Sequence, residues 1–112
     1  MMYAYLIYET RVLPVNGDVA TIGRKLDNTI VLSSKAVSRY HAEVLLTDGE
    51  YYLQDLNSSS GTFLNERRIA HPSLMKSGDF IRIADINLEF VLSDEDLDTH
   101  TKKRTSPLKP DS

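Results

Sequence analysis

Residues 42–55, which read Ala42-Glu43-Val44-Leu45-Leu46-Thr47-Asp48-Gly49-Glu50-Tyr51-Tyr52-Leu53-Gln54-Asp55, decide the fold class of this chain. Both halves of the stretch are rich in valine, leucine and tyrosine, which suit a pleated, half-buried strand. Between them stands Asp48-Gly49, a dipeptide that tolerates the positive φ angles of a tight two-residue turn. The stretch therefore predicts an antiparallel β-hairpin with strands at Ala42–Leu46 and Tyr51–Asp55.

Short segments of similar composition occur throughout residues 1–92, and turn residues such as Asn16-Gly17-Asp18 and Ser77-Gly78-Asp79 separate them. No segment carries a sustained apolar stripe of helical period. The other predicted strands are Ala4–Tyr8, Val12–Val15, Ala20–Ile22, Ile30–Leu32, Thr62–Leu64, Arg67–Ile69, Phe80–Ile83 and Asn87–Leu92. Many short strands at close spacing predict an all-β chain, folded as a β-sandwich of mainly antiparallel strands. Recognition residues of such a fold tend to lie in loops at one end of the sheets.

Composition excludes several classes of function. The chain has 112 residues, with 13 lysines and arginines against 16 aspartates and glutamates, a formal net charge of −3. A mildly acidic chain gains nothing from counterion release, so we expect no nucleic-acid partner. No apolar run approaches the roughly 18 residues of a membrane helix, and Glu9 and Arg11 closely follow the apolar start. We expect a cytoplasmic protein with no membrane partner.

Metal and cofactor chemistry find little support in the residues. Cysteine is absent, which excludes disulfides, thiolate nucleophiles, iron–sulfur clusters and cysteine-bound zinc. His41, His71 and His100 are scattered and lack the spacing of metal ligands on one helix or hairpin. The glycine-rich motifs of nucleotide-binding loops are also missing. We therefore expect no metal and no cofactor.

The composition changes near Ser93. Residues 1–92 form the predicted domain, whereas residues 93–112 hold only two leucines and no aromatic residue. This second segment opens acidic and then carries the basic run Lys102-Lys103-Arg104. It cannot bury enough apolar surface to offset its ordering entropy, so we expect a flexible, disordered charged tail or linker.

Three polar segments next to predicted strands carry the chemistry of an anion site. They are Gly23-Arg24-Lys25, Ser38-Arg39-Tyr40-His41 and Asp55–Thr62, the last of which contains the serine run Ser58–Ser60. Arginine binds phosphate bidentately, and hydroxyls donate to the remaining oxygens. Each segment alone is also typical of a solvated turn.

In their order and spacing, Gly23-Arg24, Ser38-Arg39-Tyr40-His41 and Ser60-Gly61-Thr62 resemble the signature of the forkhead-associated (FHA) domain family. Asp55-Leu56 before the serine run and Phe63-Leu64-Asn65 after it fit the same pattern, and the resemblance covers about residues 3–92. It implies a sandwich of about eleven strands that binds phosphothreonine peptides through loops at one end, a recognition mode that uses arginine clusters.

The resemblance implies a role for each matching residue. Three residues are expected to bind phosphate: Arg24, Ser38 and Ser59. Two are expected to contact the peptide: Arg39 and Ser60. Three are expected to support the loops: Gly23, His41 and Gly61.

Ser60 departs from the family pattern, which has asparagine at this position to bind the peptide backbone. Serine is shorter and lacks the amide group, and losing one hydrogen bond costs about 0.5–1.5 kcal/mol. An alternative function therefore stays open, in which the fold is a scaffold that binds partners independently of phosphate. Glu66 also departs, because many members have glycine after the residue that matches Asn65.

A catalytic triad of Ser38, His41 and Asp55 is the enzymatic alternative. No Gly-x-Ser-x-Gly elbow surrounds Ser38, no oxyanion-hole motif is present, and little chain remains to build a substrate cleft. We therefore expect no enzymatic activity.

The resemblance thus predicts an adaptor in Ser/Thr-kinase signalling, whose partners are a phosphothreonine-containing protein and an upstream Ser/Thr kinase. Thr105 is a candidate phosphosite in the tail, because a basic run precedes it and Leu108 stands three residues after it. A phosphorylated tail would then engage the domain itself or a neighbouring copy, a self-interaction favoured by the short linker. The alternative is that the tail is a solvated linker.

Overall fold

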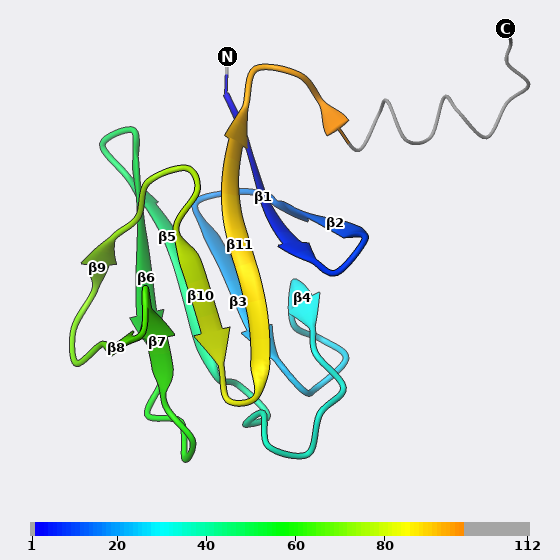
Figure 1. Ribbon diagram of the computed structural model, residues 1–112, viewed down its shortest axis with the longest axis vertical. Coiled ribbons are helices and arrows are strands. Elements are labelled where there is room, and N and C mark those ends of the chain that lie inside the picture. Colours follow the sequence, from blue (N-terminus) through cyan, green and yellow to red (C-terminus); the bar gives the residue numbers. More distant parts are fainter. Residues whose placement is uncertain (1, 98–112) are drawn as a thin grey trace, which may run out of the picture.

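The computed structural model describes residues 2–97 and is built from strands (Figure 1). These strands are β1 (Tyr3–Tyr8), β2 (Arg11–Val15), β3 (Val19–Gly23), β4 (Ile30–Val31), β5 (Ala42–Thr47), β6 (Glu50–Asp55), β7 (Thr62–Leu64), β8 (Arg67–Arg68), β9 (Ser73–Leu74), β10 (Phe80–Ile83) and β11 (Ile86–Ser93). The predicted all-β class and the number of about eleven strands are confirmed. The described residues include no helix long and apolar enough to cross a membrane.

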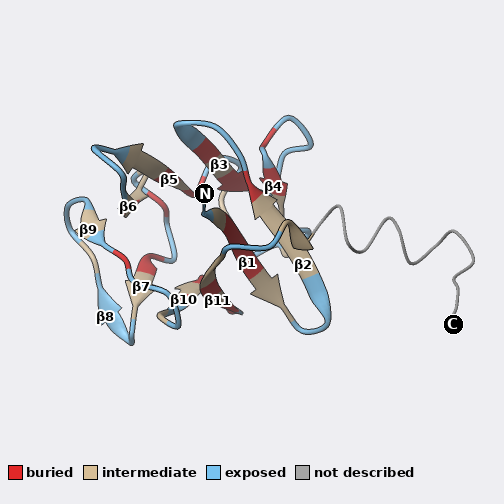
Figure 2. Ribbon diagram, turned by 90° about the horizontal axis from the view of Figure 1, so that it is seen from above, coloured by how far each residue is buried: buried red, intermediate tan, exposed pale blue. Residues whose placement is uncertain are grey.

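The strands form two sheets that pack face to face (Figure 2). One sheet has six strands in the order β2-β1-β11-β10-β7-β8, and the other has five in the order β4-β3-β5-β6-β9. Every strand pair is antiparallel except β3 with β4, which is parallel. The predicted sandwich of mainly antiparallel strands is therefore confirmed.

Alternation along each strand builds the core between the sheets. In β5, Ala42 and Val44 are buried while Glu43 between them is only partly buried. Leu53 of β6 and Phe90 of β11 are fully buried from the two opposing sheets. Full burial of one such side chain contributes about 1.5–3 kcal/mol, so a cysteine-free domain of this size can be stable on its core alone.

The predicted hairpin of residues 42–55 has the expected geometry. Thr47 pairs with Glu50, and the two residues between them, Asp48 and Gly49, have φ angles of 52° and 78°. Both positive angles are the requirement of a type I′ turn, whose twist matches that of the flanking strands. The Asp-Gly dipeptide thus sets the register in which the core residues of β5 and β6 share one face.

Two features of the sheets were not apparent in the sequence. Strand β9 consists of two residues and exists because Ser73 and Leu74 pair with β6. Tyr5 is buried, but it pairs with Val91 and Pro14 and lies apart from the core cluster between the sheets. Its hydroxyl donates to Asp96 Oδ1 (3.1 Å) and accepts the N–H of Leu97 (2.7 Å), so the end of the described chain folds over it.

The two ends of the sandwich differ. The connections β3–β4, β4–β5, β6–β7 and β10–β11 gather at the lower end in Figure 1, whereas the N-terminus and the chain after β11 lie at the upper end. The predicted polar segments all lie in or beside these lower connections.

The predicted domain boundary at residue 92 stays a prediction. Strand β11 ends at Ser93, and residues 98–112, which include the candidate phosphosite Thr105, lie outside the described residues.

Candidate functional site

Backbone hydrogen bonds bring the first two predicted segments together. The N–H of Arg24 donates to the carbonyl of Ser38 (3.0 Å), and the N–H of His41 donates to the carbonyl of Ile22 (2.8 Å). The N–H of Lys25 donates to the carbonyl of Arg39 (3.3 Å). The chain after β3 therefore runs beside the chain that enters β5, although 14 residues separate Arg24 from Ser38 in the sequence numbering.

Arg24 is exposed and its side chain is held at one nitrogen. Its Nε–H donates to the carbonyl of Val37 (2.9 Å), and Val37 itself is buried. Among the described residues, the guanidinium of Arg24 makes this one hydrogen bond. The N–H groups of its two terminal nitrogens can therefore donate to an anion. A side chain fixed at Nε loses less entropy when it binds such an anion.

Ser38 and Ser59 place two hydroxyl groups side by side. Their Oγ atoms lie 3.3 Å apart, and the backbone N–H of Ser59 donates to Ser38 Oγ (3.2 Å). Either hydroxyl can donate across the gap between the two Oγ atoms, so one of the two hydroxyl protons stays available to a ligand. The fold therefore unites the second and third predicted segments at two candidate phosphate-binding residues.

His41 is fully buried and connects the loops with both ring nitrogens. Nδ1 accepts the backbone N–H of Ser38 (3.0 Å), so Nε2 carries the proton and donates to the carbonyl of Gly61 (2.8 Å). The ring thus spans the β4–β5 and β6–β7 connections. This arrangement agrees with a supporting position and leaves no free nitrogen for general base catalysis.

The two glycines of the motif lie where a side chain would collide with neighbours. A Cβ at Gly23 would overlap the carbonyl oxygen of Arg39. Gly61 has φ +89°, and a Cβ there would lie 2.9 Å from Nε of Arg68. Gly23 is needed because the backbone of Arg39 approaches it closely. Gly61 is needed because the side chain of Arg68 approaches it closely and because its φ angle is positive.

Asp55 organises the β6–β7 connection. Its Oδ1 accepts the hydroxyls of Ser58 (2.5 Å) and Thr62 (2.6 Å), and its Oδ2 accepts the N–H of Ser58 (3.1 Å). Partial burial by itself raises the pKa of Asp55, but these hydrogen bonds to the charged form outweigh it and hold the pKa below its usual value. The carboxylate of Asp55 therefore bonds within its own loop. The ring of His41 bonds the backbone of Ser38 and Gly61 and not Asp55, so the catalytic triad considered from the sequence does not form.

Ser60, the position that departs from the motif, is exposed and bonded within the protein. Its hydroxyl donates to the carbonyl of Ala36 (2.9 Å), which ties the serine run to the β4–β5 connection. Arg39 is exposed at the same end of the sandwich. The structure therefore brings all eight predicted site residues to one end, and their roles toward a ligand remain predictions.

Asn28 is a supporting residue that the sequence analysis missed. It is buried, and its Nδ2 donates to the carbonyls of Lys25 (2.8 Å) and Arg39 (2.9 Å), which clamps the β3–β4 turn against the second segment. Its Oδ1 is buried without a hydrogen-bond partner among the described residues. The run Asp27-Asn28-Thr29 has the composition of a turn. No local signal indicates the contact to Arg39, because it spans 11 residues.

Tyr40 and Asp27 form a second missed pair at the edge of the site. The Tyr40 hydroxyl donates to Asp27 Oδ2 (2.8 Å). That hydrogen bond raises the pKa of Tyr40 above its usual value, since loss of the proton would leave two negative charges together. The carboxylate of Asp27 is thus bonded to Tyr40. The groups left to contact a ligand are mainly guanidinium, hydroxyl and backbone N–H donors, and such donors suit an oxyanion.

Comparisons with known proteins agree with this geometry. A family model described as "FHA domain" matches residues 20–84. Transcriptional regulatory protein EmbR of Mycobacterium tuberculosis is 38% identical over 91 residues, which make up 81% of this chain and 24% of EmbR. The chain thus spans about a quarter of the length of that relative.

Solved structures show the same likeness. Mycobacterium tuberculosis EmbR in complex with a low affinity phosphopeptide matches with a TM-score of 0.77 at 37% identity, covering 84% of this chain and 25% of that one. A structure from a study of phosphothreonine-dependent FHA domain interactions gives 0.77 at 25% identity, covering 83% and 99% of the two chains. The FHA domain of FhaA, complexed with the intracellular domain of Rv3910, gives 0.71 at 26% identity, covering 80% and 99%.

Proposed function

The chain belongs to the forkhead-associated (FHA) domain family, and on that basis we propose that it binds phosphothreonine peptides as an adaptor in Ser/Thr-kinase signalling. FHA domains are recognition modules, so the proposed mechanism is equilibrium binding with no chemistry on the ligand. The partner would be a protein phosphorylated on threonine by an upstream kinase. The structures of EmbR with a phosphopeptide and of phosphothreonine-dependent FHA interactions support the proposal by likeness.

The observation that carries the proposal is the grouping of Arg24, Ser38 and Ser59. A phosphate near neutral pH carries about −1.5 to −2 charges and three acceptor oxygens. In the proposed complex the terminal nitrogens of Arg24 bind two of these oxygens, and the hydroxyls of Ser38 and Ser59, 3.3 Å apart, donate to the third. Gly23, His41 and Gly61 hold the loops in place, and Arg39 contacts the peptide or its phosphate.

Ser60 supports a second candidate, a scaffold that binds partners without phosphate. Its hydroxyl proton is already donated to Ala36, so only the oxygen lone pairs remain for a peptide. An asparagine amide would offer a donor and an acceptor to the peptide backbone together. We therefore expect weaker peptide binding than with asparagine, by up to about tenfold, while phosphate binding persists.

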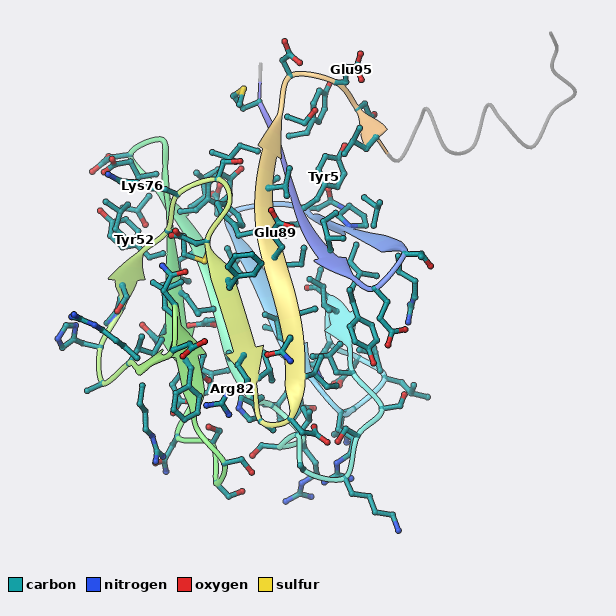
Figure 3. All side chains as sticks on the ribbon, in the orientation of Figure 1. Tyr5, Tyr52, Lys76, Arg82, Glu89 and Glu95 are labelled. Carbon is teal, nitrogen blue, oxygen red and sulfur yellow. The ribbon has the colours of Figure 1, made fainter. Side chains whose placement is uncertain are left out.

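The test is a titration with a degenerate phosphothreonine peptide pool and its unphosphorylated counterpart, followed by amide chemical shifts. Saturable shifts at Arg24, Ser38 and Ser59 with the phosphorylated pool alone are expected. Arg24→Ala should lower the affinity at least about thirtyfold, because it removes the charged partner of the phosphate. The matched control is Lys76→Ala, a basic residue at the opposite end of the molecule (Figure 3).

Either of two outcomes would count against the phosphothreonine proposal. Parent-like affinity of the Arg24→Ala variant would show that the site is misplaced. Shifts that are the same with both pools and insensitive to Arg24→Ala would favour the phosphate-independent scaffold.

A further inference from the structure

Two arginines on the outer face of the six-stranded sheet have no role in the proposed phosphate site. Arg82 of β10 pairs with Phe63 of β7, and Phe63 pairs in turn with Arg68 of β8. Residues directly opposite each other on antiparallel strands present their side chains on the same face. The three residues therefore form a row, which we call the arginine strip.

The strip is held in a defined geometry. The guanidinium carbon of Arg82 lies 3.8 Å from the centroid of the Phe63 ring, and its Nη1 donates to the carbonyl of Ala84 (3.0 Å). A guanidinium stacked on an aromatic ring keeps the donors along its edge free while losing part of its mobility. Figure 3 shows Arg82 at the end of β10 that lies beside the loops.

Most donors of the strip are unused. Within residues 2–97, the guanidinium of Arg82 donates one hydrogen bond, to Ala84, and the guanidinium of Arg68 makes no hydrogen bond or ion pair. Among the described residues, the acidic side chains near the strip include Glu66, which lines a 530 Å³ hollow together with Arg82, and Glu89 of β11, which lines a neighbouring hollow together with Glu9. None of these three carboxylates forms an ion pair with Arg68 or Arg82 within the described residues. Each guanidinium offers five donors in a fork that matches a carboxylate or phosphate.

The strip adjoins the proposed phosphate site through Gly61. Arg68 lies against Gly61, and Ala84, which accepts the bond from Arg82, donates its own N–H to the carbonyl of Gly61 (3.4 Å). Gly61 is two residues from Ser59, so their Cα atoms are at most about 7 Å apart. An extended peptide covers this distance in about two residues. Because the arginine side chains reach beyond the backbone, the group that they bind can lie one or two peptide residues further along.

We propose that the arginine strip is a second anion-binding position, which receives an acidic group about two to four residues away from the phosphothreonine of the same peptide. The group is a carboxylate or a second phosphate. The inference rests on the proposed function, because the phosphothreonine brings the peptide to this edge. In this role Arg68 and Arg82 help to select the partner. Peptides with an acidic or second phosphorylated residue near the phosphothreonine bind more tightly than peptides with a neutral residue there.

The experiment measures affinities for phosphothreonine peptides that carry one aspartate, or one phosphoserine, two to four residues before or after the phosphothreonine. Each has a partner peptide with asparagine or serine in its place. At the preferred position the parent protein should bind the anionic peptide about three- to tenfold more tightly than its neutral partner. Phosphoserine that gains more than aspartate would identify a second phosphate as the better ligand.

Arg68→Gln should reduce the ratio of the affinities for the anionic and neutral peptides to about one, while the affinity for the neutral peptide stays the same. Arg82→Gln should lower this ratio by a smaller amount. Lys76→Gln, an equal change in charge at the far end, should leave the preference intact. An unchanged preference in Arg68→Gln, or equal loss for both peptides, would overturn the inference and leave the strip as packing around Phe63. Thermal unfolding of each variant shows whether its fold is kept.

A further arm separates this inference from the proposed function. An aspartate peptide with unphosphorylated threonine is titrated while the Nε–H signals of the arginines are followed. Shifts at Arg68 and Arg82 but not at Arg24, in a protein that binds no phosphothreonine peptide, would sustain the anion position and reject the proposed function. Absence of shifts at Arg68 and Arg82 with every anionic peptide would reject the anion position alone.

Discussion

At the scale of single residues, His41 joins two loops of the site. Its ring accepts the N–H of Ser38 and donates to the carbonyl of Gly61, so one side chain sets the distance between two loops. His41 itself is fully buried, its bond to Gly61 is buried, and its bond from Ser38 is partly buried. Removing the ring would leave a cavity, a donor and an acceptor without partners, and each carries a free-energy cost.

We therefore predict that His41→Ala lowers the free energy of unfolding by about 2–4 kcal/mol and weakens phosphopeptide binding. Urea denaturation measures the first effect, and calorimetric titration below the unfolding transition measures the second. The control is His71→Ala, an exposed histidine that should change neither quantity. Parent-like stability and binding of His41→Ala would show that the loops hold their positions without it.

At the scale of elements, the β7–β8 turn shows how one residue strains a hairpin. Leu64 pairs with Arg67, so Asn65 and Glu66 form a two-residue turn with φ angles of 50° and 69°. Asparagine tolerates a positive φ, whereas glutamate carries a side chain that crowds the backbone there. The departure at Glu66 noted in the sequence is thus accommodated by strain, with the turn itself preserved.

We predict that Glu66→Gly raises the free energy of unfolding by about 0.5–1 kcal/mol, because relief of strain exceeds the added entropy of the unfolded chain. Chemical denaturation of the purified domain is the measurement. Glu50→Gly, at an exposed strand position without positive φ, should instead be destabilising. A loss of stability in Glu66→Gly would mean that the glutamate side chain makes a contribution larger than the strain.

At the scale of the whole molecule, Asp55 connects the two sheets. It ends β6 in the five-stranded sheet, and it accepts the hydroxyl of Thr62, which begins β7 in the six-stranded sheet (2.6 Å). Burial opposes the charge, but the hydrogen bonds from Ser58 and Thr62 prevail and lower the pKa of Asp55. The unfolded chain therefore binds a proton at a higher pH than the folded one, and this contribution to stability is lost in acid.

We predict that the contribution of Asp55 to the free energy of unfolding is fully present above about pH 5, begins to fall near the unfolded pKa of about 4, and is lost as the pH drops through the lower folded pKa. Asp55→Asn should be less stable at neutral pH and should show a shallower decline in acid. Asp48→Asn, at an exposed turn position, is the control. Identical acid slopes for the parent and Asp55→Asn would exclude the linkage.

Local chemistry explains how much of this protein could be predicted. Strand composition and turn dipeptides act over a few residues, so the sandwich class and the Asp48-Gly49 hairpin could be derived directly from the chain. The order of Gly23-Arg24, Ser38–His41 and Ser60-Gly61 identified the family, and with it the end of the molecule at which the candidate site lies. The sequence by itself therefore determined the fold class and the family, and it predicted eight site residues that the fold brings to one end of the sandwich.

Tertiary structure alone decided how these parts are joined, because the joining contacts link residues far apart in the chain. Asn28 reaches Arg39 across 11 residues, Ser60 reaches Ala36 across 24, and Tyr5 reaches Leu97 across 92. Strand β9 and the arginine strip likewise depend on register between strands that are distant in sequence. No local propensity encodes such pairs; they form when burial of the shared core offsets the entropy of closing the intervening chain.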